Sequence, residues 1–242
     1  MYSLFDDNIA MDIEKLSKSI GYKFKKENLL KEALTHRSYL NENPSWRFSH
    51  NERLEFLGDA VLELVVTEIL YSKYPNYDEG KLTSFRAALV NYQMMADISK
   101  NIELENSLLL SKGESKDIGR ARDVILANAT ESLIGAIYLD GGYESAKKFI
   151  EKFIMAELEN VVEKGLYRDA KSELQEKTQA NQKITPIYRV ISEEGPDHKK
   201  IFTVGVHLAD KLIATGQGMS KQDAEVDAAK KALQELQNRI NQ

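Results

Sequence analysis

Three carboxylates lie three and four residues apart in one short segment, a spacing that could bring them to one cation. The segment 51–64 reads NERLEFLGDAVLEL and carries Glu52, Glu55 and Asp59. Spacings of three and four residues place such side chains on one face of a helix. A row of carboxylates beside a packed core predicts a bound cation, although such a row is more often only the solvated face of an amphipathic helix.

The same helix is expected to turn an apolar side toward a core. Gly58 lies inside it, where glycine costs a helix about 1 kcal/mol relative to alanine, so we expect another part of the chain to approach its backbone closely. The side chains expected on the apolar side are Leu54, Leu57, Val61, Leu64 and Val65.

A second helix, expected over Arg120–Asp140, carries the matching polar face. Asn128 and Glu131 are one turn apart, and Gly135 lies a turn further along, where its small size permits close helix packing. The apolar surface of this helix is expected from Ile125, Leu126, Leu133, Ile134 and Ile137. If the two polar faces pack together, they form an all-oxygen site suited to Mg²⁺ or Mn²⁺. Its members would be Glu55, Asp59, Asn128 and Glu131.

Zinc is not expected, because the chain has no cysteine and its histidines lack ligand spacing. Each histidine is expected to be an ordinary polar residue; they are His36, His50, His198 and His207.

Composition predicts a cytoplasmic protein of one or two domains. The chain has 242 residues, 42% of them hydrophobic, with no membrane-length apolar run, no secretory signal pattern and no cysteine. Its net charge is −5, but residues 169–242 carry eleven basic and eleven acidic residues, so the excess acid lies in residues 1–168. Phosphate binding depends on where cations are placed, so this total does not exclude a nucleic-acid partner.

The periodicity divides the chain into two domains. Residues 1–163 are expected to form an all-helical domain, with amphipathic helices from residue 12 and turns at 43–44, 75–76 and 141–142. Residues 164–169 are expected to be a linker.

Residues 170–242 are expected to form a small α+β domain. Its order is a helix at 171–181, strands within 184–194, 200–210 and 211–220, and a final helix at 220–238. Alanines of the final helix are expected to let it lie close on the sheet; they are Ala224, Ala228, Ala229 and Ala232.

The first half of the chain resembles bacterial ribonuclease III, a double-stranded-RNA endonuclease. NERLEFLGDAVLEL is similar to that family's signature segment. Four further strings agree in the same order: LTHRSY, DEGKLTSFRAALVN, LLLSKGE and ESLIGAIYLDGG. The resemblance implies an all-α endonuclease domain that needs Mg²⁺, with Mn²⁺ as a substitute, and forms a homodimer.

The resemblance assigns roles to single residues. It places Glu55, Asp59, Asn128 and Glu131 at the metal-ligand positions. It also implies that Glu52 and Glu79 are further acids of the cleavage valley. Phe56 corresponds to an aromatic residue that inserts into the partner subunit, although a plain core phenylalanine is the alternative.

Asn128 departs from the family pattern, which has aspartate at this position. An amide oxygen can bind a hard cation but brings no negative charge, so metal affinity is expected to fall. The asparagine is either a natural variation or a deliberate isosteric substitution that traps uncut substrate.

The second half resembles the double-stranded-RNA-binding domain, with α-β-β-β-α order. The resemblance implies RNA contacts from Gln175, Gln179, His198, Ser220 and Lys221. A helix N-terminus at Ser220 also favours an anion on physical grounds. Gln222 replaces a second lysine often found in the family, and Glu225 and Asp227 follow it, which predicts weaker phosphate binding.

The expected function is cytoplasmic RNA processing, including ribosomal and messenger RNA. Metal-assisted hydrolysis of double-stranded RNA is expected to leave 5′-phosphate and 3′-hydroxyl ends. Two alternatives are a double-stranded-RNA-binding protein inactivated by Asn128 and a helical scaffold with unrelated acids.

Overall fold

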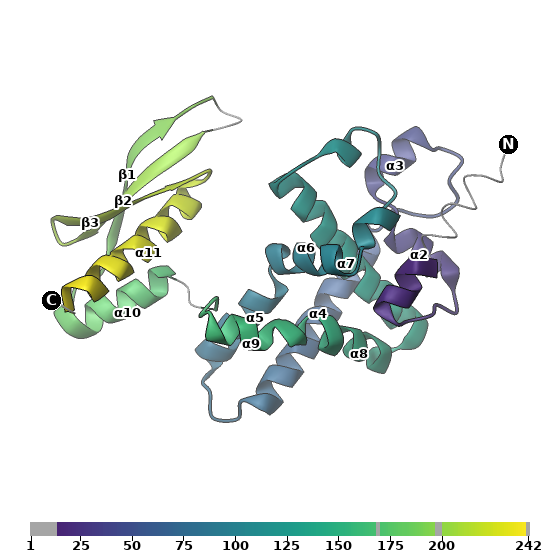
Figure 1. The fold of residues 1–242 in the computed structure, drawn as a ribbon, viewed down its shortest axis with the longest axis horizontal. Coiled ribbons are helices and arrows are strands. Elements are labelled where there is room, and N and C mark those ends of the chain that lie inside the picture. The colour runs from purple at the N-terminus through teal and green to yellow at the C-terminus, as the bar shows by residue number, and fades with distance from the viewer. Residues whose placement is uncertain (1–13, 168–169, 197–199, 241–242) are drawn as a thin grey trace. The chain divides into compact units, whose positions relative to one another are not determined.

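The structure, a computed structural model, consists of two compact units, Met1–Tyr167 and Arg168–Gln242 (Figure 1). It describes residues 14–167, 170–196 and 200–240. His198 therefore lies outside the described residues. Among those described, no helix combines the length and apolar character that crossing a bilayer requires.

The described part of the first unit is built from helices and short 3₁₀ turns. Residues 14–20 are helical and precede the labelled elements. In chain order these are α2 (Glu27–Ala33), α3 (Arg37–Glu42), α4 (Glu52–Lys73), α5 (Glu79–Val90), α6 (Tyr92–Asn101), η1 (Leu104–Ser107), η2 (Glu114–Lys116), α7 (Arg120–Gly141), α8 (Tyr143–Phe153), η3 (Met155–Glu157) and α9 (Leu158–Glu163).

The core of this unit forms around α4 and α7, the most extensively packed pair of elements. Each of these helices is 22 residues long. All the apolar residues predicted to supply the surface of α7 are buried, as expected. On α4, Leu54, Val61 and Val65 are buried and Leu57 is half-buried. This pair of helices carries every acid of the predicted metal site.

Leu64 was expected in the core, and this prediction is wrong. Its side chain is 58% exposed. Leu64 follows Phe56 by two steps of four residues, so the two share a helix face that is turned away from α7. A single apolar stripe in the sequence therefore belongs to two faces of α4, one buried and one exposed.

Asp140, near the end of α7, fixes the segment that leads into α2. Its carboxylate accepts hydrogen bonds from the Tyr22 hydroxyl at 2.7 Å and from the backbone N–H groups of Lys25 and Lys26 at 2.9 and 2.8 Å. Burial alone would raise the pKa of Asp140, but these hydrogen bonds together lower it below its ordinary value. The ionised carboxylate therefore stabilises the fold at this point.

The second unit has the predicted α-β-β-β-α order. Its elements are α10 (Ala170–Gln182), β1 (Ile187–Glu194), β2 (Ile201–Leu208), β3 (Lys211–Gly218) and α11 (Lys221–Ile240). The three strands form an antiparallel sheet in the order β1-β2-β3. A Cβ on Gly216 would lie 2.1 Å from the Ala228 nitrogen. The predicted alanine face of α11 is buried, so this helix lies close on the sheet as expected.

Candidate functional site

The acidic face of α4 meets α7 at a crossing of two glycines. A Cβ built on Gly58 would lie 1.7 Å from the backbone oxygen of Glu131. One built on Gly135 would lie 2.3 Å from the backbone oxygen of Leu54. The two backbones are thus in direct contact, and the close approach predicted for both glycines is confirmed.

This crossing brings the carboxylates of the two helices close enough to change one another's pKa values. Burial raises the pKa of Glu131 to about 7, and the negative charges of Asp59 and Glu55 add to the rise. The pKa of Glu55 is also raised, first by burial and then by Glu52 and Asp59. The carboxylates therefore destabilise one another's charged forms, and a bound cation would relieve this repulsion.

Asn128 lies half-buried one turn before Glu131. Its backbone oxygen accepts a hydrogen bond from the buried Ser132 hydroxyl at 2.7 Å, and that hydroxyl also lies 3.2 Å from the backbone oxygen of Asn51. Asn51 directly precedes α4. Ser132 therefore links the polar stretch of α7 to the start of the acidic helix.

Glu52 is exposed at the first turn of α4, between two basic side chains. Its carboxylate lies 3.7 Å from the Arg37 guanidinium and 3.7 Å from His50 Nδ1. The sequence did not indicate these neighbours, because Arg37 reaches Glu52 from α3. Glu52 thus faces solvent at the edge of the cluster, where it can contact water or substrate.

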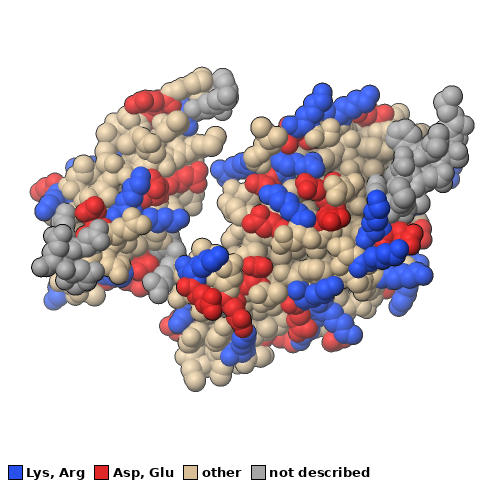
Figure 2. All heavy atoms as spheres, in the orientation of Figure 1, with Lys and Arg blue, Asp and Glu red and all other residues tan. Residues whose placement is uncertain are grey.

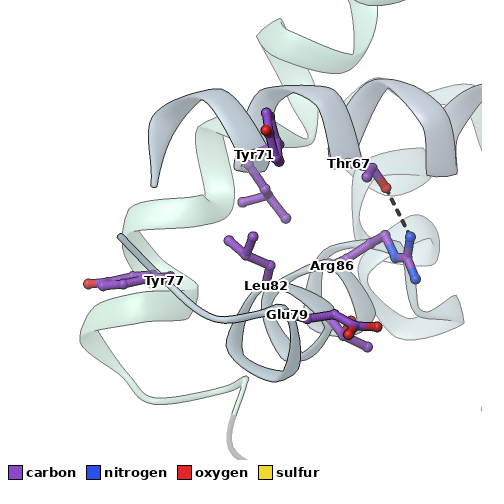
Figure 3. Close-up of a pocket in the computed structure, with 8 residues that line it drawn as sticks. Thr67, Tyr71, Tyr77, Glu79, Leu82 and Arg86 are labelled. Atoms are coloured by element: carbon purple, nitrogen blue, oxygen red, sulfur yellow. Dashed lines mark hydrogen bonds between the residues drawn. The ribbon is translucent and has the colours of Figure 1, made fainter. Parts of the chain in front are cut away.

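Glu79 lies apart from the other predicted site acids of the same chain. It is the first residue of α5 and lines a cavity of about 410 Å³ between α4 and α5, together with Thr67, Tyr71 and Arg86 (Figure 3). Thr67 follows Asp59 by eight residues, about 12 Å along a helix. The first unit by itself does not gather all six predicted acidic-site residues into one place.

Phe56 is 82% exposed, so within this chain the alternative of a core phenylalanine is wrong. Leu64 and Tyr71, which is 75% exposed, continue the same face of α4 toward the cavity. Tyr71 and Arg86 were not singled out from the sequence. The signal that could have found Tyr71 is its position on the apolar row that starts at Phe56.

The residues predicted to contact RNA have separate surroundings. Gln175 and Gln179 are exposed on α10. Ser220 caps α11: its hydroxyl accepts from the Asp223 N–H at 3.1 Å and donates to the Asp223 carboxylate at 2.7 Å. Lys221 lies 3.2 Å from a carboxylate oxygen of Glu193 on β1. The start of α11 is therefore already satisfied by groups of the chain itself.

Comparison with known proteins agrees with both halves of this description. Residues 26–158 match the Ribonuclease-III-like family, and residues 170–236 match the double-stranded RNA binding motif. Ribonuclease 3 of Leptospira interrogans is 47% identical over 94% of this chain and 90% of the relative. The corresponding protein of Syntrophobacter fumaroxidans is 45% identical over 92% of this chain and 93% of the relative. The chain belongs to the ribonuclease III family.

A solved structure supports the fold of the first unit. The nuclease domain of ribonuclease III from Campylobacter jejuni is 44% identical, with a TM-score of 0.54, and the match covers 60% of this chain and 96% of that one. The chain is thus an endoribonuclease of the ribonuclease III type with a double-stranded-RNA-binding domain.

The chemistry of the acidic cluster in this member of the ribonuclease III family fits a hard cation. Its donors are carboxylate and amide oxygens, which suit Mg²⁺ or Mn²⁺ and not zinc. As the side chains stand, no group of three or more His, Cys, Asp or Glu in the described residues is placed to hold a metal ion. The shared electrostatics of Glu55, Asp59 and Glu131 places them near one another, and the ligand set stays a prediction.

Proposed function

We propose that this chain is a divalent-metal-dependent endoribonuclease that cleaves double-stranded RNA in cytoplasmic RNA processing, with ribosomal and messenger precursors among its substrates. The observation that carries the proposal is the crossing of α4 and α7, where Glu55, Asp59 and Glu131 share one charged neighbourhood. The double-stranded-RNA-binding motif of the second unit supplies the substrate class.

The acidic residues have distinct tasks in this proposal. Glu55, Asp59 and Glu131 would hold Mg²⁺ or Mn²⁺, with a neutral oxygen from Asn128. When bound there, the cation would supply Lewis-acid chemistry, that is, activation of water at neutral pH and stabilisation of the leaving oxygen. The water oxygen forms a bond to phosphorus, the bond from phosphorus to the 3′ oxygen breaks, and that oxygen takes up a proton. The products carry 5′-phosphate and 3′-hydroxyl ends.

The remaining roles follow from position and charge. Glu131, with a pKa of about 7, is only partly ionised near neutral pH, so a proton competes with the cation for its carboxylate. Glu52, exposed at the rim, would orient water or the RNA strand. No side-chain nucleophile is required.

The exposed face of α4 supports a two-fold homodimer. Leu64 lies about midway between Phe56 and Tyr71, at about 12 and 10 Å along the helix. A two-fold axis near Leu64 would bring Phe56 of each chain to the α4/α5 cavity of the other, because a two-fold interface pairs the same surfaces reciprocally. The same operation would carry Glu79 toward the acidic cluster of the second chain. The solved nuclease domain from Campylobacter jejuni, which is similar to the first unit, has structural flexibility in a region involved in dimer formation.

Cleavage of a long RNA duplex tests the proposed reaction. The protein is incubated with the duplex in Mg²⁺, in Mn²⁺ and in EDTA, and the product ends are identified. We expect metal-dependent cutting to short duplexes, and loss of cutting in Glu131→Gln. Metal-independent cutting, or cutting of single strands alone, would overturn the proposal.

Comparison with Asn128→Asp distinguishes a metal site that Asn128 weakens from one that Asn128 inactivates. Restoring a carboxylate should lower the metal concentration needed for half-maximal rate by about tenfold or more, because a charged ligand replaces a neutral one. Equal rates and equal metal dependence in both proteins would contradict a weakened site. Duplex binding without cutting in the original chain, with cutting restored in Asn128→Asp, would contradict catalysis by this chain.

A further inference from the structure

Three of the described lysines near the predicted RNA contacts of the second unit are paired with acids of the same unit. Lys171 Nζ lies 2.5 Å from a carboxylate oxygen of Glu225, which links α10 to α11. Glu193 on β1 lies between two cations, 3.2 Å from Lys221 Nζ and 3.7 Å from Lys200 Nζ. On the face drawn in Figure 2, acidic and basic side chains of this unit alternate without a continuous basic patch.

Lys171 belongs to the region expected to contact RNA. It lines a cavity of about 410 Å³ in the second unit together with Gln175 on α10 and Gln222 on α11. Gln175 is a predicted RNA contact, and Gln222 directly follows Lys221. The two lysines thus flank the places where an RNA backbone is expected to pass.

The first turns of α11 add acid where phosphate is expected. The Ser220 hydroxyl caps the helix and donates to the Asp223 carboxylate in the first turn, and Glu225 follows two residues later. A helix N-terminus attracts anions, but here a carboxylate of the chain already lies in its first turn. A phosphate approaching this end of α11 therefore meets carboxylates beside each lysine.

We propose that Glu193 and Glu225 limit the affinity of this domain for double-stranded RNA by holding Lys221 and Lys171. The inference rests on the proposed duplex binding and names the residues that set its strength. The Lys221–Glu193 pair is exposed and the Lys171–Glu225 pair is half-buried. Such pairs are weak, so each lysine can exchange its carboxylate for a phosphate, but breaking the pair costs part of the free energy that the phosphate contact supplies. Binding of duplex RNA therefore neutralises fewer phosphates, and releases fewer counterions, than the number of lysines implies.

Binding of the full chain to an uncut RNA duplex in EDTA tests this inference, with dissociation constants measured at several salt concentrations. The double variant Glu193→Gln/Glu225→Gln keeps the side-chain shape and an acceptor for each lysine. We expect it to bind about 3- to 10-fold more tightly near 0.1 M salt, with a steeper salt dependence, because more counterions are released. Glu235→Gln, exposed on α11 and ten residues beyond Glu225, is the matched control and should bind as the original chain does.

A second pair of variants tests whether the gain acts through the two lysines. Lys171→Gln/Lys221→Gln should weaken binding, and adding the two glutamate substitutions to it should give no gain. A gain that survives without the lysines, or that Glu235→Gln reproduces, would overturn the inference in favour of a general charge effect. Unchanged binding by the glutamate variant of a chain that binds and cuts duplex would overturn this inference alone. No duplex binding by any variant would overturn the proposed function as well. Thermal unfolding of each variant verifies that its second unit is folded.

Discussion

Gly58 and Gly135 lie at the crossing of α4 and α7, where neither has room for a Cβ. A methyl group on Gly58 would come within 1.7 Å of the Glu131 backbone oxygen and 2.9 Å of the Gly135 nitrogen. The spacing of the carboxylates on the two helices is therefore set by backbone contact and not by side-chain packing. Any residue larger than glycine must separate the helices or shift their crossing.

Gly58→Ala should destabilise the first unit by about 3 kcal/mol or more, because overpacking against backbone atoms cannot be relieved by a change of rotamer. The free energy of unfolding, measured by urea titration, checks this. Gly80→Ala is the matched control, since the nearest atom to a Cβ there is an Asp78 carboxylate oxygen at 3.5 Å and Gly80 is helical. The control should be neutral or stabilising by up to about 1 kcal/mol. Equal stability of both variants would contradict direct backbone contact at Gly58.

Glu131 should make the metal-free protein less stable as pH rises. Its pKa is raised from 4.5 to about 7, so the folded state keeps a proton that the unfolded state has already released. This contribution to the free energy of unfolding is fully present below about pH 4.5 and is lost as pH rises through about 7. Glu131→Gln removes the titration. The free energy of unfolding of the variant minus that of the original chain should therefore rise by on the order of 2 kcal/mol from pH 4.5 to pH 8.

The measurement compares unfolding free energies of the two proteins in EDTA across this pH range. Their difference removes the contribution of groups that titrate alike in both proteins. Parallel pH curves would show that Glu131 is not buried beside the other carboxylates.

Asp140→Asn should weaken the connection between α7 and the segment before α2 by about 2 kcal/mol, since one amide oxygen replaces a carboxylate that accepts three hydrogen bonds. The lowered pKa of Asp140 gives the sign of its pH effect: its contribution is present above the ordinary pKa of 3.8 and is lost as pH falls through the lower folded value. Thermal unfolding at neutral and acid pH checks both points. The deficit of the variant should shrink toward acid pH, and a deficit independent of pH would argue against an ionised Asp140.

The sequence predicted the position of a side chain correctly where that position depends only on the face of a single helix. Glycine inside a helix is costly, so Gly58 and Gly135 predicted the close crossing, and spacing placed the acids beside it. Glu79 was harder to place, because the turn before α5 carries it to the far end of α4. The pairing of Glu193 with Lys221 joins residues 28 positions apart through the fold of the second unit, and no local pattern encodes it. Leu64 was misplaced because exposed and buried apolar faces of α4 look alike in sequence.

Phe56→Ala should weaken self-association of the full chain. The side chain is 82% exposed on a face continued by Leu64 and Tyr71. Burying an aromatic ring in a cavity typically contributes about 2 kcal/mol, and the two rings of a two-fold dimer together make this roughly a 1000-fold change in the dimer dissociation constant. Sedimentation equilibrium measures that constant. Ile118→Ala is the control, because Ile118 is 87% exposed and belongs to the loop between η2 and α7, not to α4.

The dimer arrangement also predicts a pattern of complementation. If Glu79 serves the acidic cluster of the second chain, mixing Glu79→Gln with Glu131→Gln places both substitutions at one site of each mixed dimer and leaves the other site intact. Mixed protein should then recover cutting of one strand, which neither variant shows alone, and nicked duplex is the product to measure. If Glu79 acted within its own chain, each site of the mixed dimer would carry one substitution and cutting would stay absent.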